Sequence, residues 1–463
     1  MKTFPNKINY TPHGSPTING IHNSISHEPQ EVKKETIIGI PESPEFRQAV
    51  QKVVGPIPEN LPLPVPGGPE KIIERPPLTI KLSPVDISKI VNKVKQEGVM
   101  KRAIRFGIVG LGQGGGRIAG EFEALGYPTI AINTSEQDLN ESPCKERVLI
   151  GTGGAGRTLS VGKEKVNTHR SEIMSAYQRL FKDIDHAIVC AGSSGGTGGG
   201  GIIDLIDTLR DYKKPVGVIT TLPLVSEDTR SKKNTLSVLN ELVKLNAEKK
   251  ISPLIIIDNA KIEKKHPGLS TLDFWVTANK DVVKCFDLFN ILSARNSAYT
   301  SLDPADYKKI ITSGGCMIFG NITVTGDLQM DSISSAITTN INSGLLAEGF
   351  NLVEATTAGC IIVGSKEKLK GLQMASQEGA FVTLMNLLGS GTIFKGVYEH
   401  ESVKDLEVFF MISGLGLPVP KIKSLIDEAK IEREHLEKKA TVRSVDDIMK
   451  DLAGEAEDGG ATQ

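Results

Sequence analysis

Short apolar runs alternate with amphipathic stretches from about residue 105 onward. A run typical of a buried strand begins at Arg105 and leads into a glycine-rich segment, and further such runs occur at 128–132, 148–150 and 184–189. After the last run, apolar residues recur at intervals of three and four from Ile202 to Leu209, which is typical of a helix. Arg117–Leu125 has the same helical character. Strands that alternate with helices predict an α/β fold built on a parallel sheet.

A long helical pattern over 271–299 separates this region from a second one, in which the predicted strands and helices follow a different order. Further strands are predicted at 316–320, 358–364, 392–398 and 408–416, and amphipathic helical stretches at 332–346 and 366–386. We therefore expect a second, smaller α+β domain after a central helix. Residues 421–440 form a highly charged stretch of helical character, which is typical of a solvated face.

Proline dominates the first part of the chain. Fifteen of the 24 prolines lie in the first 84 residues, and Pro56–Pro69 favours extended backbone over packed structure. We expect a disordered arm over 1–85, followed by a helical stretch at Val85–Lys101. Five regions result: the arm at 1–85, an α/β domain at 86–270, a central helix at 271–300, an α+β domain at 301–420, and a charged helix with a tail at 421–463.

Charge and cysteine content exclude several classes of protein. The formal net charge is −1, so no basic excess favours nucleic acid or an anionic membrane surface. The five cysteines form no CxxC pair, which favours reduced thiols over disulfides or zinc ligands. No apolar run is long enough to span a bilayer, and the N-terminus lacks a signal-peptide core. We expect a cytoplasmic protein without a transmembrane segment.

Three glycine-rich segments follow predicted strands, at 110–116, 151–156 and 192–201. Glycine leaves backbone N–H groups uncovered, and a helix N-terminus adds partial positive charge, so such segments bind phosphate well. The carboxyl ends of parallel strands meet at one edge of a sheet. The central segment carries glycines for which we see no packing purpose. The pattern predicts a ligand with more than one phosphate.

The first segment also matches GxGxxG, the dinucleotide fingerprint, at 110–115. A nicotinamide cofactor needs an acidic residue at the end of the next strand to hold a ribose hydroxyl. That strand ends in Asn133 and Thr134. An NAD-dependent oxidoreductase is therefore the less favoured alternative.

The central segment contains GxSxG at 192–196, the nucleophile elbow of serine hydrolases. That function needs a downstream acid and then a histidine. The downstream histidines, His266, His400 and His435, stand in highly charged or otherwise unpromising contexts. The hydrolase interpretation also leaves the further glycines unexplained.

GSSGGTGGGG at 192–201 resembles the glycine-rich signature of the tubulin/FtsZ family of GTPases. Further segments resemble that family's motifs in order: GLGQGGG at 110–116, NTSEQDL at 133–139, TLPLVSEDTR at 221–230, IIIDNAKI at 255–262, TANKDVV at 277–283 and SLDPADYKKI at 301–310. The resemblance covers roughly 105–420. Gly199 and Arg117 depart from the family pattern, and no anchor-binding peptide is recognisable at the C-terminus.

The resemblance implies a GTP site and assigns its residues. Phosphate and loop contacts fall on Gly112, Gln113, Gly114, Gly115, Asn133, Gly153, Gly154, Gly192, Ser194, Gly195, Gly196, Thr197 and Gly198. Glu227 and Arg230 occupy the ribose loop, with Arg230 one residue earlier than the family's arginine. Asn259 and Asp281 are the expected base-reading residues, because guanine presents N–H donors that a carboxylate or amide oxygen accepts.

The resemblance also implies that Asp303 and Asp306 are catalytic and act on the GTP of the adjacent subunit. Locally, DPAD is an ideal helix start as well, so capping is a compatible interpretation. Mg²⁺ is the expected cofactor beside GTP, and no residue stands out as its ligand. Hydrolysis in this arrangement requires head-to-tail assembly, which generates filaments when the contact does not close.

The sequence therefore predicts a GTP-hydrolysing cytoskeletal protein whose main partner is itself. Its role is cell division or the positioning of DNA or particles, as in a phage, viral or plasmid member of the family. An adaptor is expected to bind the N-terminal arm or the C-terminal tail. The alternative is a structural filament that binds nucleotide with little hydrolysis.

Overall fold

The computed structural model describes residues 101–265, 268, 270–325, 331–341, 344, 346–401 and 403–440. All of them belong to one compact unit within Leu63–Gln463. The predicted arm at 1–85, the helix expected at 85–101 except its last residue, and the tail after 440 lie outside the described residues.

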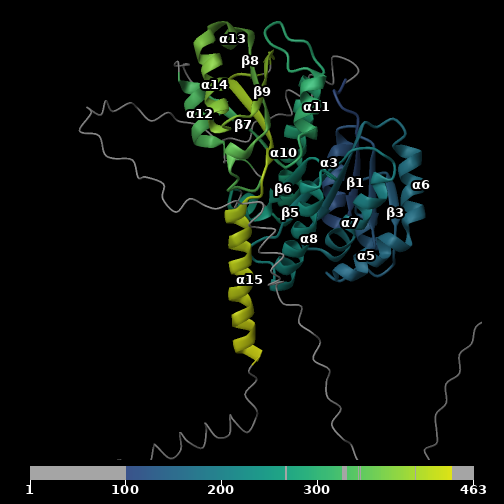
Figure 1. The fold of residues 1–463 in the computed structure, drawn as a ribbon. Coiled ribbons are helices and arrows are strands. Elements are labelled where there is room, and N and C mark those ends of the chain that lie inside the picture. Colours follow the sequence, from purple (N-terminus) through teal and green to yellow (C-terminus); the bar gives the residue numbers. More distant parts are fainter. Residues whose placement is uncertain are drawn as a thin grey trace, which may run out of the picture. The chain divides into compact units, whose positions relative to one another are not determined.

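One sheet of ten strands runs through the described part of the chain, in the order β3-β2-β1-β4-β5-β6-β7-β10-β8-β9 (Figure 1). Its first six strands pair in parallel, as the sequence predicts. They are β1 (Phe106–Leu111), β2 (Thr129–Asn133), β3 (Glu146–Leu149), β4 (His186–Gly192), β5 (Val216–Leu222) and β6 (Leu254–Asp258). The strand order reverses direction between β1 and β4, which is where open α/β sheets bind ligands.

Helices connect these strands. They are α3 (Gly112–Ala124), α4 (Glu136–Asn140), α5 (Leu159–Thr168), α6 (Arg170–Leu180), α7 (Gly196–Arg210), α8 (Thr229–Ala247) and α9 (Asn259–Lys265). Strands β1 and β6 are buried along their whole length. This explains their continuous apolar sequence, because strands covered on both faces do not alternate with polar residues.

The central helix is α10 (Thr271–Leu292), which contacts both α3 and β7. It begins at the predicted residue, where Ser270 caps it by accepting a hydrogen bond from the Asp273 N–H. It ends well before residue 299, and a separate helix, α11 (Pro304–Thr312), follows. The predicted single helix over 271–299 is therefore too long.

The second region continues the same sheet. Its elements are β7 (Cys316–Val324), α12 (Ser332–Asn340), the short 3₁₀ helix η1 (Leu352–Glu354), β8 (Thr357–Gly364), α13 (Lys366–Gly371), α14 (Met374–Leu387), β9 (Thr392–Glu399), β10 (Leu406–Leu415) and α15 (Val419–Ala440). β7 pairs in parallel with β6 through Cys316 and Met317. β10 is antiparallel to both β7 and β8. The expected α+β region is present, joined to the α/β region through the sheet.

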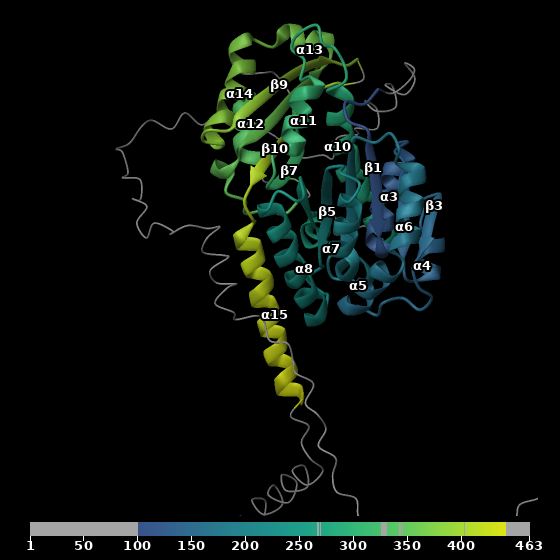
Figure 2. The same cartoon turned by 45° about the vertical axis from the view of Figure 1, so that its right-hand side comes forward.

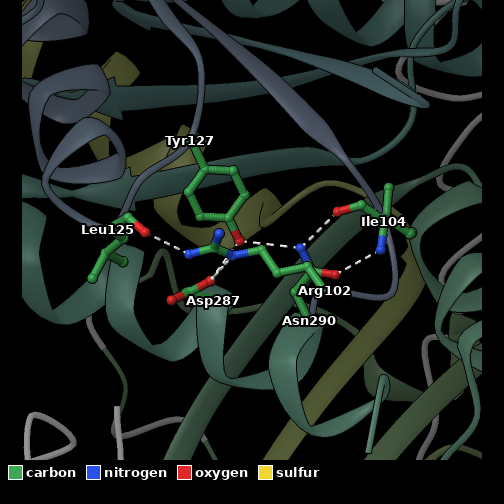
Figure 3. Close-up of polar contacts among 6 residues, drawn as sticks. All are labelled: Arg102, Ile104, Leu125, Tyr127, Asp287 and Asn290. Carbon is green, nitrogen blue, oxygen red and sulfur yellow. Dashed lines mark hydrogen bonds and ion pairs between the residues drawn. The ribbon is translucent and has the colours of Figure 1, made fainter. Parts of the chain in front are cut away.

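A buried polar network fastens the segment before β1 to α10 (Figure 3). Arg102 Nε lies 2.7 Å from Asp287 Oδ1, and the Tyr127 hydroxyl donates to the same oxygen at 2.6 Å. Asn290, one turn further along α10, accepts from the Ile104 N–H at 2.8 Å and donates to the Ile104 carbonyl at 2.9 Å. Both hydrogen-bonding groups of that backbone unit are thus satisfied within the protein.

All five cysteines are buried and none forms a disulfide, as the sequence predicts. None of the described helices is long and apolar enough to cross a lipid bilayer.

Candidate functional site

A cleft of about 450 Å³ opens at the carboxyl edge of the parallel strands. The three glycine-rich segments converge on it, as predicted. Of the residues expected at the site, those lining it are Gly112, Gln113, Gly114, Asn133, Gly154, Gly192, Ser194, Gly195, Gly196, Thr197, Gly198, Glu227 and Asn259. Gly115, Gly153, Arg230 and Asp281 are not among its lining residues.

The first segment is a helix start rather than the predicted loop. β1 ends at Leu111 and α3 begins at Gly112, whose φ of +71° suits glycine. Gly112, Gln113 and Gly114 form the first turn at the cleft, where helical N–H groups have no partner within the helix. Gly115 has another role: a Cβ there would collide with the carbonyl oxygen of Cys190, so it lets α3 pack closely on β4.

The central segment also becomes helical earlier than predicted. Gly195 is the N-cap of α7, and the glycines from Gly196 to Gly201 lie inside the helix. A Cβ on Gly200 would collide with the carbonyl oxygen of Leu159, and one on Gly196 would contact Ala155. The expectation that these glycines serve no packing purpose is therefore wrong, because α5 and its preceding loop lie directly against α7.

Gly195 differs from its neighbours. A Cβ built on it would have no atom within 4 Å, and its φ of −81° is open to any residue. Glycine at this position leaves room at the mouth of α7 that no protein atom fills. The N-termini of α3 and α7 both face this space, and each contributes the partial positive charge of a helix start.

The third segment supplies Gly154 and Gly156, both with positive φ, and Arg157 beside them. Gly153 instead pairs with Ser135 in an isolated β-bridge. Arg157 Nη1 lies 2.8 Å from Asp228 Oδ2, on the N-cap residue of α8. Arg157 is a lining residue that no sequence motif pointed to.

The resemblance places Arg230 in the ribose loop. Its guanidinium donates to the Thr158 hydroxyl at 2.8 Å and does not reach the cleft. The Ser231 backbone N–H and the Arg157 guanidinium hold the pKa of Asp228 below its usual range, so this carboxylate stays charged beside Arg157.

α10 brings Trp275 and Asn279 to the cleft, not Asp281. Residues four apart share one side of a helix, whereas residues two apart do not face the same way. Asp281, two positions after Asn279, lies on another side of the helix and is not among the lining residues, and its contact with the base stays a prediction. The spacing of four places Trp275 and Asn279 on one side of α10, but only the packing of the helix shows that this side faces the cleft. Arg117 also lines the cleft, with its guanidinium carbon 6.0 Å from the centre of the Trp275 ring.

Asn133 is the last residue of β2, and Asn259 follows β6 directly as the first residue of α9. Asn133 Oδ1 accepts from the Ser135 N–H at 3.2 Å. Gln113 donates to Asp138 Oδ1 at 3.0 Å, which links the starts of α3 and α4. Glu227 Oε1 accepts from the Leu224 N–H at 3.0 Å and shapes the loop after β5.

Neither alternative chemistry is assembled in the cleft. Ser194 lines it, but the described lining residues include no histidine, so a serine-hydrolase triad is not formed there. β2 ends in Asn133, without the carboxylate that a nicotinamide cofactor's ribose needs.

Asp303 and Asp306 do not line this cleft. They lie at the start of α11, beyond the C-terminal end of α10, whereas Trp275 and Asn279 sit near its N-terminal end. At 1.5 Å per residue, about 20 Å of helix separates Asn279 from Leu292. The chain therefore presents the cleft and the two acids at opposite ends of α10.

Comparison with known proteins gives two family matches. Residues 105–266 match the GTPase domain of the Tubulin/FtsZ family, and residues 288–425 match the C-terminal domain of TubZ-like Tubulin/FtsZ-like proteins. The tubulin-like protein TubZ of Bacillus cereus is 26% identical over 379 residues, covering 73% of this chain and 86% of TubZ.

Solved structures share the fold. A GTPγS-form protofilament of TubZ from Bacillus thuringiensis serovar israelensis superposes with a TM-score of 0.70 at 20% identity, covering 78% of this chain and 100% of that one. A type III plasmid segregation TubZ gives a TM-score of 0.64 at 19% identity, covering 78% of this chain and 98% of that one.

Proposed function

This chain belongs to the tubulin/FtsZ family, with a GTPase domain followed by a TubZ-like C-terminal domain, and we propose that it hydrolyses GTP while polymerising head to tail. The observation that carries the proposal is the convergence of three glycine-rich segments and two helix N-termini on one cleft at the switch point of the sheet.

The triphosphate lies across the N-termini of α3 and α7 in this proposal. Backbone N–H groups at Gly112–Gly114 and Gly195–Gly198 donate to its oxygens, and the open space at Gly195 admits them. Arg157 supplies the nearest positive side chain of the third segment. Gly115, Gly153 and Arg230 keep supporting roles in packing and loop structure.

The base lies at the other end of the cleft. The Trp275 ring stacks on it, and the amides of Asn259 and Asn279 read its edge, because an amide offers both an acceptor and donors. Glu227 accepts from a ribose hydroxyl. Asn279 takes the part that the sequence assigned to Asp281.

Mg²⁺ fits this donor set as a companion of the phosphates. Among the described residues, no group of three or more His, Cys, Asp and Glu side chains forms a metal cage. Mg²⁺ usually binds one or two carboxylates, several waters and the substrate phosphates. Asp138 and Glu227 are the carboxylates lining the cleft, and Asp138, which the ribose does not use, is the candidate for such a contact. The ion neutralises phosphate charge when bound.

Hydrolysis uses two subunits in this proposal. Asp303 and Asp306 lie at the opposite end of α10 from the cleft, so a head-to-tail contact brings them to the γ-phosphate of the neighbouring subunit. There they orient a water molecule, whose oxygen bonds to the γ-phosphorus as the bond to the β–γ bridging oxygen breaks. GDP and inorganic phosphate are released, and the water's proton passes to the carboxylate or to solvent.

DNA segregation is the favoured cellular role over cell division. The C-terminal domain match is to TubZ-like proteins, and one structural relative is a plasmid segregation TubZ. Self-association supplies the filament, since TubZ relatives were solved as protofilaments. An adaptor that binds the arm or the tail is part of the same proposal.

To test this proposal, right-angle light scattering and released phosphate are measured together after GTP and Mg²⁺ are added. The measurement is repeated over a range of protein concentrations. We expect scattering to rise above a critical concentration and phosphate release to appear only there. Assembly without phosphate release favours the structural-filament alternative. Silence in both channels, combined with selective NAD binding, overturns the proposal.

A further inference from the structure

Helix α15 lies along α8, in contact with the GTPase domain (Figure 2). One of its faces carries Lys421, Leu425, Glu428 and Ala429, at the spacing of a single helical face. Leu425 and Ala429 are buried, so this is the face that packs against the protein. The two charged residues on it therefore need partners within the fold.

Lys421 pairs with a buried carboxylate. Its Nζ lies 2.8 Å from Oδ2 of Asp258, the last residue of β6, whose side chain is 2% exposed. Removing a carboxylate from water is costly unless a counter-charge and hydrogen bonds stabilise it. Lys421 supplies that counter-charge from a helix more than a hundred residues away in the sequence.

Asp258 is connected to the cleft through the backbone at the start of α9. Its Oδ1 accepts from the Lys261 N–H at 3.3 Å, in the first turn of α9. The first residue of α9 is Asn259, which is buried and lines the cleft. The position of the Asp258 side chain therefore determines the direction in which the Asn259 side chain leaves the backbone.

A second contact joins the same face of α15 to α8. Glu428 Oε2 lies 3.7 Å from Lys232 Nζ in the first turn of α8. That turn begins at Asp228, the partner of Arg157, and follows directly on Glu227. α15 thus contacts Asp258, the residue before Asn259, and Lys232, in the helix that follows Glu227.

We propose that Lys421 is a positioning residue of the nucleotide site, holding Asp258 and through it Asn259 in the arrangement that binds the base. The proposal rests on the proposed function of the cleft. Docking of α15 and nucleotide binding are then coupled, and linkage requires that each strengthens the other.

The experiment measures binding to the full-length protein by isothermal titration calorimetry, with GDP and separately with inorganic tripolyphosphate. GDP avoids hydrolysis, and tripolyphosphate occupies only the phosphate end. Lys421→Met is compared with Lys423→Met, which removes an exposed lysine from another face of the same helix. We expect Lys421→Met to weaken GDP binding by about 5- to 150-fold, the usual range of coupling between sites. Tripolyphosphate binding and the Lys423→Met protein should match wild type.

Asp258→Asn provides the second measurement, because asparagine caps a helix as well as aspartate and needs no counter-charge. In this background Lys421→Met should alter GDP affinity less than twofold, even if the single variant does not fold. The inference is overturned if Lys421→Met lowers GDP affinity more than twofold in the Asp258→Asn background. It is also overturned if Lys421→Met weakens GDP and tripolyphosphate binding equally, or if it leaves GDP binding at the wild-type level. If wild type binds neither GDP nor GTP, the proposed function itself falls.

Discussion

Asp303 Oδ1 accepts a hydrogen bond from the Asp306 backbone N–H at 2.8 Å, so the first acid caps the helix that carries the second. Asp306 makes a weaker interaction, an ion pair in which its carboxylate lies 3.5 Å from Lys309 Nζ. The Asp306 side chain is 25% exposed. Exposed pairs of this kind contribute little to stability. The two acids look equivalent in the sequence, but Asp303 stabilises the start of α11 as its N-cap and Asp306 does not.

Asp306→Ala should abolish phosphate release while leaving GDP binding and the melting temperature of the unassembled protein near wild type. The reason is that Asp306 has no buried partner, and its proposed role lies in the neighbouring subunit. Phosphate release above the critical concentration is the measurement. Normal turnover in this variant would remove Asp306 from the mechanism.

Asp303→Ala should lower the free energy of unfolding by about 1 kcal/mol, the usual cost of losing an N-cap, in addition to any effect on turnover. Asp303→Asn keeps the cap and removes the charge, so it separates the two duties. If Asp303 is catalytic, Asp303→Asn unfolds in urea like wild type but releases phosphate more slowly. Turnover at the wild-type rate would leave Asp303 with capping alone.

Trp275 is the only tryptophan in the sequence, so its emission reports on the cleft without a label. We expect GDP to change this emission, and Trp275→Ala to weaken GDP binding by about 1–3 kcal/mol, the usual value of a base stacked on an aromatic ring. Trp275→Phe should retain most of the affinity. Fluorescence that stays constant while calorimetry detects GDP binding would place the base elsewhere.

Arg102→Met should lower the free energy of unfolding by about 3–5 kcal/mol, because it leaves the fully buried Asp287 without its counter-charge. The matched control is Arg105→Met, which breaks the exposed pair with Asp185 and should cost less than about 1 kcal/mol. Urea denaturation of both variants measures the difference. Equal losses would show that the Arg102 network contributes no more than a surface pair.

Glu407 on β10 should make stability depend on pH. Burial raises the pKa of its carboxyl to about 8, and the Thr323 hydroxyl lies 2.9 Å from one of its oxygens. Between the unfolded pKa near 4.3 and about 8, the folded state holds a proton that the unfolded state has lost. Stability should therefore fall as pH rises through this range, by up to about 1.4 kcal/mol per pH unit from this group.

Glu407→Gln removes that proton and serves as the control. The wild type should lose more stability than Glu407→Gln between pH 6 and pH 8 in urea denaturation. Parallel pH profiles would contradict a neutral, buried Glu407.

Local sequence determined much of this protein. Runs such as Phe106–Leu111 are apolar along their whole length and predicted buried parallel strands, because both faces of such strands are covered. The glycine-rich segments follow those strands, and parallel strands end at one edge, so their convergence on one cleft was predictable. Asn133, Asn259 and Glu227, which the resemblance to the tubulin/FtsZ family assigned to the site, also line the cleft.

Tertiary structure decided what depends on how elements rotate and approach one another. The rotation of α10 brings Trp275 and Asn279 to the cleft and places Asp281 on another side of the helix, which composition and spacing alone left open. The path of the loop after β3 puts Arg157 at the cleft and leaves Arg230 against Thr158. Gly200 is glycine because α5 lies against α7, a contact between distant segments. The pairing of Lys421 with Asp258 has the same origin, since the packing of α15 along α8 brings the two residues together and no local preference encodes it.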